Sequence, residues 1–303
     1  MVAAHCLTIR QTGLLAGTAL VLALLLPVLG DGSEPPYGLV RALIVTLGGL
    51  LCVAIARRAE RQHADLTRMT RIAERAMIPS LPAELGGVRL TTHTRSATRN
   101  ARIGGDLHEA IATPAGARLI IGDVKGHGLD AAHLSAAVLS AFRRTAATAP
   151  DLACLARDLD ARIGPDLGPE DFVTVLLAEF VPGAVLLVNC GHPAPIRVDS
   201  RLRVLEPPRP CPPLGLSPHP YVWRVRLQPS DRLLLFTDGF TEARDRSGTQ
   251  VPFEEHLHAA LTAPTLAEAL RDLLDLLRPD HSTRTRPDDL TLILAQPADA
   301  PQE

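Results

Sequence analysis

Four aspartates in this 303-residue chain each stand in a short turn beside an apolar run. Asp123 directly follows the run that begins at Arg118, and Asp238 follows the run that begins at Arg232. Apolar runs of this length are typical of buried strands, so a carboxylate emerges where each strand ends. Carboxylate oxygens suit Mg²⁺ or Mn²⁺ better than zinc, which favours Cys and His. We interpret the four positions as ligands of a hard divalent metal site: Asp106, Asp123, Asp238 and Asp288.

Charge and cysteine usage exclude several other classes of protein. The formal net charge is -2 and the Lys and Arg residues are spread along the chain, so the basic surface of a nucleic-acid-binding protein is absent from the sequence pattern. We therefore expect no nucleic-acid partner. The five cysteines are odd in number and form no C-x-x-C pair, which argues against a disulfide framework or a thiolate zinc site.

Two apolar runs near the beginning of the chain predict a transmembrane hairpin. Residues 12–30 carry no charge, and a second run at 39–56 follows a short acidic, Pro-rich loop. The first run is long enough to cross about 30 Å of hydrocarbon as a helix, and the second run after a short loop makes a helical hairpin the better interpretation. By the positive-inside rule, the arginines after the second run place both chain termini and the domain that follows in the cytoplasm. The two spans together predict a multi-pass protein of the cell membrane, in contact with lipid. The alternative is a hairpin buried inside a globular protein.

Residues 57–82 read as a helical linker, and residues 83–297 as the main domain with a short tail at 298–303. The linker carries a brief apolar stripe at spacings of three and four residues. This stripe either pairs two copies of the chain into a homodimer or packs a single amphipathic helix onto the main domain. Its members are Leu66, Met69, Ala73 and Ala76.

The main domain has the pattern of an α+β protein, because runs of short alternating strands are interrupted by grouped helices rather than by one helix after each strand. This grouping indicates mainly antiparallel sheets. We predict helices at 129–147, 152–163, 253–261 and 266–277. We predict strands at 88–94, 107–113, 118–124, 172–180, 184–189, 195–198, 222–227, 232–236 and 290–295.

The order and spacing of the aspartates, together with other short motifs, resemble the metal-dependent protein phosphatases of the type 2C superfamily, in the bacterial branch of SpoIIE and RsbU. The resemblance runs from about Ala73 to Ala295. A single tetrapeptide of this kind would carry little weight, but here seven segments occur in the order of the family. The segments without aspartate ligands are Phe172-Val173-Thr174-Val175, Asn189-Cys190-Gly191-His192-Pro193 and Pro213-Leu214-Gly215-Leu216.

This resemblance implies an αββα sandwich of two antiparallel sheets flanked by helices, preceded here by the predicted hairpin. It also implies a centre of two Mn²⁺ or Mg²⁺ ions bridged by Asp123, with the backbone carbonyl of Val124 as a further ligand. Asp106, Asp238 and Asp288 match the remaining metal ligands. By the same resemblance, Asp123 and Asp238 are the residues expected to be essential for catalysis.

Five further residues are expected to support the centre. Gly105 stands beside the first aspartate, and Asp289 follows Asp288 and is expected to act from outside the ligand set. Glu109 stands where the family often has aspartate. Lys125 either meets a phosphate group or is a solvated loop lysine, and His127 either makes a structural hydrogen bond or transfers a proton.

The resemblance implies a serine/threonine protein phosphatase that acts on a cytoplasmic regulatory phosphoprotein, of the kind of the phosphorylated anti-anti-sigma factors of partner-switching systems. Two other classes remain open from the sequence. One is a catalytically inactive phosphatase fold that holds a partner protein at the membrane. The other is a small membrane scaffold with a structural metal, which carboxylate ligands in open turns disfavour.

Overall fold

The computed structural model describes residues 81–95, 105–125, 129–241, 255–277 and 289–298, together with helical positions 43, 47–49, 51, 54 and 58. The chain divides into two compact units, Met1–Thr70 and Arg71–Glu303. The apolar stripe of the predicted linker lies outside the described residues, so its pairing of two copies stays a prediction.

The predicted multi-pass location in the cell membrane is corrected by the structure. Within the part of the chain that the structure describes, no helix has both the length and the apolar character needed to cross a membrane. A span needs about 20 consecutive apolar residues, whereas α3, at Leu129–Thr145, has 17 residues and carries two arginines in its last turn. The predicted spans at 12–30 and 39–56 lie outside the described residues, apart from the helical positions named above. No contact with membrane lipid is shown by the described residues.

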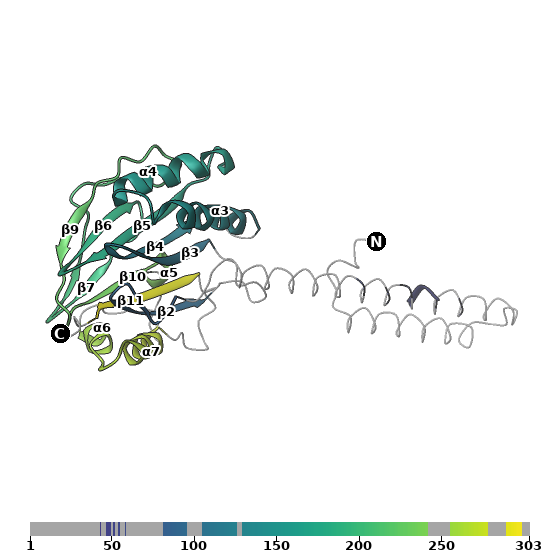
Figure 1. Cartoon of the computed structure of the whole chain (residues 1–303). Helices are drawn as coiled ribbons and strands as arrows, with labels where there is room; N and C mark the ends of the chain where they lie inside the picture. The colour runs from purple at the N-terminus through teal and green to yellow at the C-terminus, as the bar shows by residue number, and fades with distance from the viewer. Residues whose placement is uncertain are drawn as a thin grey trace, which may run out of the picture. The chain divides into compact units, whose positions relative to one another are not determined.

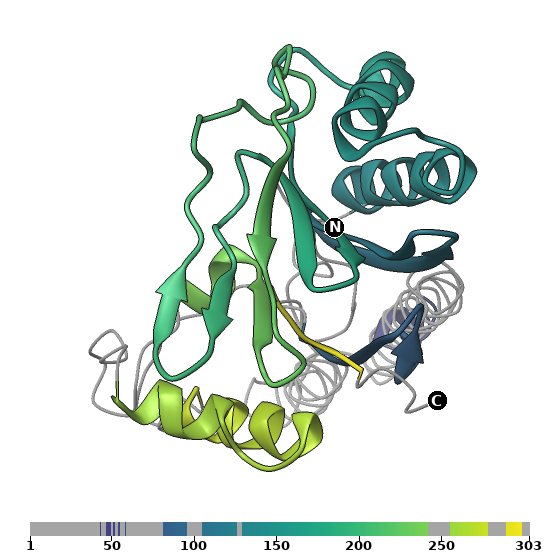
Figure 2. The same cartoon turned by 60° about the vertical axis from the view of Figure 1, so that its left-hand side comes forward.

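Two antiparallel sheets face each other in the second unit (Figures 1 and 2). The strand order in the six-stranded sheet is β1-β2-β11-β10-β7-β8 and in the five-stranded sheet is β3-β4-β5-β6-β9, counted over the described residues. The six-stranded sheet consists of β1 (Glu84–Leu85), β2 (Val88–Arg95), β7 (Ile196–Val198), β8 (Leu202–Val204), β10 (Arg232–Phe236) and β11 (Leu290–Pro297). The five-stranded sheet consists of β3 (Asp106–Thr113), β4 (Gly116–Val124), β5 (Val173–Val181), β6 (Ala184–Cys190) and β9 (Trp223–Arg226).

Helices cover the outer face of each sheet, which confirms the predicted αββα arrangement. Helix α3 and α4 (Leu152–Ile163) pack on the five-stranded sheet, and α6 (Glu255–Leu261) with α7 (Leu266–Leu276) lie on the other (Figure 2). Local signals fix where α4 and α7 begin: the Asp151 side chain accepts a hydrogen bond from the Cys154 N–H, and Thr265 forms a capping box with Glu268. The short elements η2 (Gly164–Asp166) and α5 (Asp238–Thr241) complete the domain.

The alternation of side chains along the strands divides the apolar residues between the layers. On β4, Leu119 and Ile121 face the core between the two sheets, whereas Ile120 faces the core under α3 and α4. Successive strand residues point to opposite faces, so a one-residue shift would exchange these environments. On β10, Leu233 joins the core between the sheets and Leu234 the core under α6 and α7.

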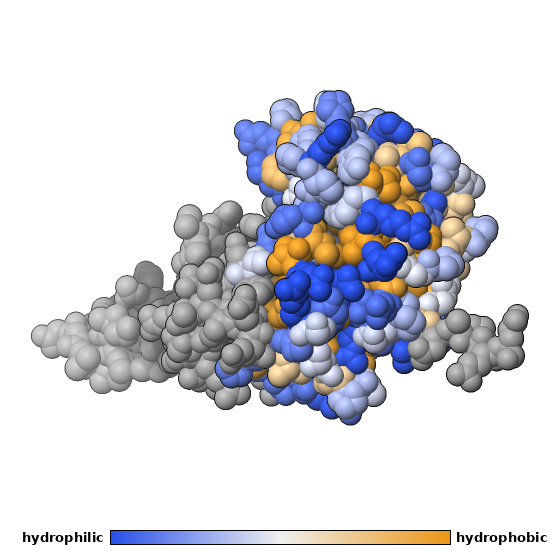
Figure 3. Space-filling model, turned by 90° about the vertical axis from the view of Figure 1, so that its left-hand side faces the viewer, coloured by the Kyte–Doolittle hydropathy of each residue, from blue (hydrophilic) through white to orange (hydrophobic). Residues whose placement is uncertain are grey.

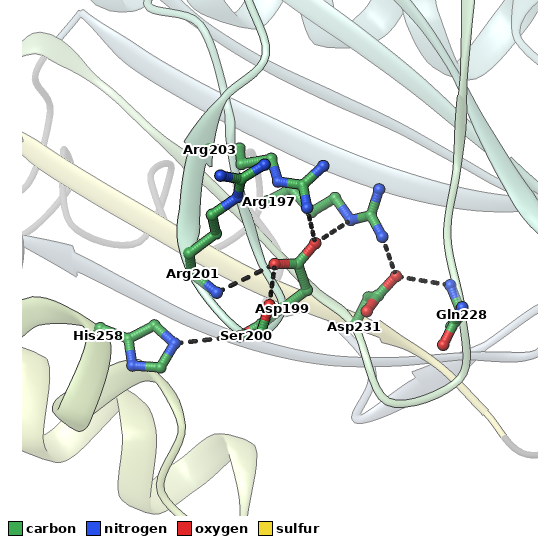
Figure 4. A network of polar contacts seen from close by, with 8 residues as sticks. All are labelled: Arg197, Asp199, Ser200, Arg201, Arg203, Gln228, Asp231 and His258. Atoms are coloured by element: carbon green, nitrogen blue, oxygen red, sulfur yellow. Dashed lines mark hydrogen bonds and ion pairs between the residues drawn. The ribbon is translucent and has the colours of Figure 1, made fainter.

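An ion-pair network fastens the short β7–β8 hairpin to its surroundings (Figure 4). Arg197 Nη2 lies 2.9 Å from Asp231 Oδ2, and the same oxygen accepts a hydrogen bond from the Gln228 N–H. Asp199 Oδ2 lies 3.3 Å from both Arg197 Nε and Arg203 Nη2. Because Arg197 belongs to β7 and Asp231 directly precedes β10, the network joins neighbouring strands beyond their backbone hydrogen bonds.

The β8 and β9 edges carry exposed arginines beside partly exposed apolar residues. Val204 is 55% exposed, and Trp223 and Val225 are half-buried against the core between the sheets. Figure 3 shows apolar and hydrophilic groups interleaved on this side of the domain. Charged side chains on an edge strand oppose pairing with another chain. The arginines are Arg201, Arg203, Arg224 and Arg226.

Candidate functional site

Two of the predicted ligands lie directly opposite each other on neighbouring strands. Asp106 begins β3, Asp123 lies next to the end of β4, and the two are register partners in the antiparallel ladder. Both point toward the space between the sheets, because they alternate in step with Ala110 and Ile121, which contact that core. Directly opposed residues of antiparallel strands have Cβ atoms about 4.5–5.5 Å apart. The strand register therefore brings two carboxylates together at one end of the sandwich.

Asp106 is a buried carboxylate in which only one of the two oxygens accepts a hydrogen bond from the described residues. Its side chain is 4% exposed, and its Oδ2 accepts a hydrogen bond from Thr237 Oγ1 at 2.9 Å. Oδ1 has no hydrogen-bond partner among the described residues. Burial raises the pKa of Asp106 to about 7, against the opposing effect of the Thr291 and Thr237 hydroxyls. The negative charges of Asp289 and Asp238 raise this pKa further, so the site favours a positive ligand.

Asp238 and Asp289 come from the opposite sheet. Asp238 is exposed and begins α5, one residue removed from the end of β10, and Asp289 directly precedes β11. Asp289 Oδ2 accepts a hydrogen bond from the Gly105 N–H at 3.1 Å, which connects the two sheets across this end of the domain. Gly239 allows the two turns to meet, since a Cβ there would lie 1.9 Å from the Asp289 carbonyl oxygen.

Gly105 makes the closest approach to the paired aspartates. A Cβ at this position would lie 2.5 Å from Asp123 Oδ1 and 2.3 Å from the Val124 carbonyl oxygen. Helix α3 also holds this turn, because Ser135 Oγ donates a hydrogen bond to the Gly105 carbonyl at 3.0 Å. Only glycine leaves room for the carboxylate of Asp123 and the carbonyl of Val124 to lie side by side at this point.

A second polar network supports Asp123 from the end of β6. Thr174 Oγ1 donates a hydrogen bond to the Asp123 carbonyl at 3.3 Å and lies 3.0 Å from His192 Nδ1. The Asn189 side chain brackets the His192 backbone, donating to its carbonyl and accepting from its N–H. Burial lowers the pKa of His192 to about 3, so this imidazole is neutral at pH 7 and has a structural part in the site.

Two predicted supporting residues point elsewhere. Glu109 lies three positions after Asp106 on β3, so it faces the helix side of the sheet, where its Oε2 pairs with Arg143 of α3 at 2.5 Å. Lys125 Nζ donates to the Glu170 carbonyl at 3.2 Å and lies 5.4 Å from the centre of the Phe172 ring. Among the described residues, neither the Glu109 nor the Lys125 side chain contacts the aspartates of the candidate site.

Asp288, the fourth predicted ligand, and His127 fall outside the described residues. Among the residues that the structure does describe, no three His, Cys, Asp or Glu side chains come close enough together to hold a metal ion. The described part of the site therefore supplies donors of the right chemistry without completing a coordination shell.

Sequence reasoning missed the hydroxyl groups that hold this site. Thr237 is completely buried, and its Oγ1 bonds Asp106 while accepting from the Thr291 N–H at 2.9 Å. Ser135 on α3, which bonds the Gly105 carbonyl, was also not predicted from the sequence to belong to the site. The available signal was the placement of Thr237 at the end of a strongly apolar run, where a buried hydroxyl requires a partner.

The family model described as Stage II sporulation protein E (SpoIIE) matches residues 113–297, which is more than half of the chain. The chain belongs to the SpoIIE family. Asp123, Asp238 and Asp288 of this SpoIIE-family chain lie inside the matched range, and Asp106 lies just before it. The predicted membership of the SpoIIE and RsbU branch is confirmed.

Solved structures share the fold of this SpoIIE-family domain. The RsbU and RsbW domains of Rv1364c from Mycobacterium tuberculosis match at 25% identity and a TM-score of 0.63, over 72% of this chain and 62% of that one. The SiaA-PP2C domain of Pseudomonas aeruginosa matches at 19% identity and a TM-score of 0.64, over 80% of this chain and 98% of that one. The catalytic domain of the serine/threonine phosphatase PstP, in complex with two manganese ions, matches at 20% identity and a TM-score of 0.53, over 71% of this chain and 100% of that one.

Proposed function

We propose that this SpoIIE-family chain is a metal-dependent serine/threonine protein phosphatase, with its activity in residues 83–297. The observation that carries this proposal is the pairing of Asp106 with Asp123 across β3 and β4, with Asp106 buried and one of its oxygens without a partner. A buried carboxylate is costly unless it is paired with a cation or fully hydrogen-bonded. The charges of Asp238 and Asp289, which raise the pKa of Asp106, increase that cost in the absence of a cation.

The donors fit Mn²⁺ or Mg²⁺, and two ions agree with the PstP complex. We assign the carboxylates of Asp106, Asp123, Asp238 and Asp288 and the carbonyl of Val124 as the groups that hold them. When bound, such ions lower the pKa of a coordinated water and offset the charge on a phosphoryl group. Gly105 admits the donors at close range, and Thr237 and Asp289 fix their orientation.

We infer that the substrate is a phosphoserine or phosphothreonine protein of the partner-switching kind, such as a phosphorylated anti-anti-sigma factor. The support for this inference is family membership and the likeness to a protein that contains RsbU and RsbW domains. The match covers 62% of that solved chain.

The deciding experiment is release of phosphate from a phosphoserine peptide and from a purified phosphorylated anti-anti-sigma factor by the full chain. We expect release with Mn²⁺ and its loss after chelation with EDTA, and we expect the phosphoprotein to be the better substrate. A rate of phosphate release that is the same with Mn²⁺, without Mn²⁺ and after addition of EDTA would contradict the metal assignment. Tight binding of the phosphoprotein without turnover would favour the inactive binding module instead.

The adjacent aspartates Asp288 and Asp289 are expected to differ in their effects on turnover. Asp289 Oδ2 is already occupied by the Gly105 N–H, so Asp289→Asn retains an acceptor and should lower turnover by ~10 to 100-fold. Asp288→Asn should cost more, because it removes a charge from the ligand set. Steady-state kinetics of both variants at saturating Mn²⁺ checks this order. Equal losses would show that the two residues share one role.

Removing the Thr237 hydroxyl is expected to weaken metal binding. Thr237→Val keeps the shape of the side chain but loses the hydrogen bond to Asp106, which should lower Mn²⁺ affinity by ~10 to 100-fold. The matched control is Thr237→Ser, which keeps the hydroxyl and should bind nearly as the parent does. Calorimetric titration with Mn²⁺ measures both variants. An unchanged affinity in folded Thr237→Val would refute the orienting role.

A further inference from the structure

Two thiols outside the proposed metal centre lie in contact within the core beneath α4. Cys190 ends β6, and Cys211 lies 21 positions later, in the segment between β8 and β9. Their Sγ atoms are 3.8 Å apart, and the residues Cys190 and Cys211 are 0% and 8% exposed. Among the described residues both are free thiols.

The backbone on both sides of these thiols is fixed by independent contacts. Val173 pairs with Leu214, and Val175 pairs with Gly191, so β5 holds the residues that follow each cysteine region. Gly191 packs directly on Pro213, and a Cβ at Gly191 would lie 2.6 Å from Pro213 Cγ. The backbone at both cysteines is therefore tied to β5, which keeps the two residues next to each other.

The two Sγ atoms, 3.8 Å apart, are in van der Waals contact, and they must approach by a further ~1.8 Å to reach the S–S bond length of about 2.05 Å. Reactive groups held in contact react as if at very high effective concentration. The unfolded chain has no such advantage, since closing a loop of this length costs chain entropy.

We propose that Cys190 and Cys211 form an oxidisable dithiol, which becomes an intrachain disulfide by exchange with a small-molecule disulfide such as glutathione disulfide. The Cys211 thiolate, on the more exposed side chain, attacks one sulfur of the small disulfide and expels one thiolate. Cys190 then loses its proton and attacks Cys211 Sγ, and the second small thiol leaves. The protein loses two protons and two electrons, and the small disulfide is reduced to two thiols.

The order of attack follows from the surroundings of each thiol. Burial raises the pKa of Cys190, and the neighbouring Cys211 and Asp160 of α4 raise it further. Cys190 is therefore a poor first nucleophile, because the thiolate is the reacting form. As the second nucleophile it needs to reach only a sulfur that already lies against it.

The product is expected to stiffen one specific part of the domain. The cross-link ties the end of β6 to the segment that leads into Pro213 and Leu214, and it closes a loop in the unfolded chain. The oxidised protein should therefore melt about 5–10 °C above the reduced protein. This inference concerns the fold and does not depend on phosphatase activity.

Peptide mapping tests the proposal directly. The full chain is equilibrated with glutathione disulfide, its free thiols are blocked with iodoacetamide, and it is digested with trypsin. Because trypsin does not cut before proline, Cys211 falls in peptide 204–224 and Cys190 in peptide 163–197. We expect these two peptides to be recovered joined, and to separate on reduction with dithiothreitol.

Two serine variants separate the effect of the Cys190–Cys211 pair from that of another cysteine, Cys154. Cys154→Ser removes a partly exposed thiol on α4 and should leave both the joined peptides and the rise in Tm intact, whereas Cys211→Ser should abolish both. Recovery of Cys190 and Cys211 as separately alkylated peptides, or of Cys211 only as its glutathione adduct, would overturn the proposal. The peptide result on the parent chain decides the matter even if Cys211→Ser folds poorly.

Discussion

Replacing Asp123 by asparagine is expected to lower turnover by at least ~10²-fold, which corresponds to a loss of roughly 3 kcal/mol of transition-state stabilisation. Asp123 lies directly opposite Asp106, and the substitution removes one of two facing charges without changing the shape of the side chain. Asp238→Asn should have a similar effect. The measurement is kcat and KM for a phosphopeptide at saturating Mn²⁺.

An aspartate outside the site provides the control for this loss. Asp272 is exposed on α7, on the outer layer of the six-stranded sheet, and Asp272→Asn should leave turnover unchanged. Thermal melts should show that the Asp123→Asn variant remains folded, because asparagine keeps the size and shape of the side chain. Full turnover of Asp123→Asn with added Mn²⁺ would remove Asp123 from the metal centre.

Substitution of Arg118 by methionine is expected to destabilise the domain by ~3–5 kcal/mol, the usual cost of removing one partner from a buried ion pair. Arg118 Nε lies 2.8 Å from Glu179 Oε1 on the neighbouring strand, and both residues are about 95% buried. Arg118 Nη1 also donates to the Ala146 and Ala149 carbonyls at 2.7 Å, where the chain leaves α3. Methionine leaves a buried carboxylate and two carbonyls without these donors. Urea denaturation followed by circular dichroism measures the loss.

A double substitution separates the charge from the packing at this position. Combining Arg118→Met with Glu179→Leu removes both charges. The free energy of unfolding of the double variant should therefore fall less than that of Arg118→Met alone. If the single and double variants are equally destabilised, the ion pair does not account for the loss. The carbonyls of Ala146 and Ala149 would then be the main reason for the arginine.

Strong periodicity made most of the sandwich predictable from sequence. Strands such as β4 and β10 contain long apolar runs, and the structure places them within one or two residues of the predicted bounds. The strands β1 and β8 were missed because two or three residues show only a weak alternation, although β7, also of three residues, was predicted. Each exists because a neighbouring strand supplies its hydrogen bonds, which is a tertiary effect.

The candidate site was predictable only for residues whose type and position relative to a strand are visible in the sequence. Aspartates at strand ends do so, and the register of β3 and β4 then pairs Asp106 with Asp123. Glu109 shows the limit of motif comparison: residues three apart on a strand face opposite sides, so it pairs with Arg143 rather than joining Asp106. The contact of Thr237 with Asp106 crosses 131 positions of sequence and has no local signal.

The strand order has a consequence for how the domain is made. The five-stranded sheet contains no strand later than β9, so it can assemble with α3 and α4 while the rest of the chain is still being synthesised. The six-stranded sheet cannot, because β11 is the strand that joins β2 to β10. Synthesis of the segment between β2 and β11 takes roughly 10–40 s at ~5–20 residues per second. In the last part of that interval, once β10 has been made, Asp106 and Asp123 can pair although Asp289 has not yet been made, so the nascent domain would hold half a site and an open β10 edge that a chaperone would have reason to cover.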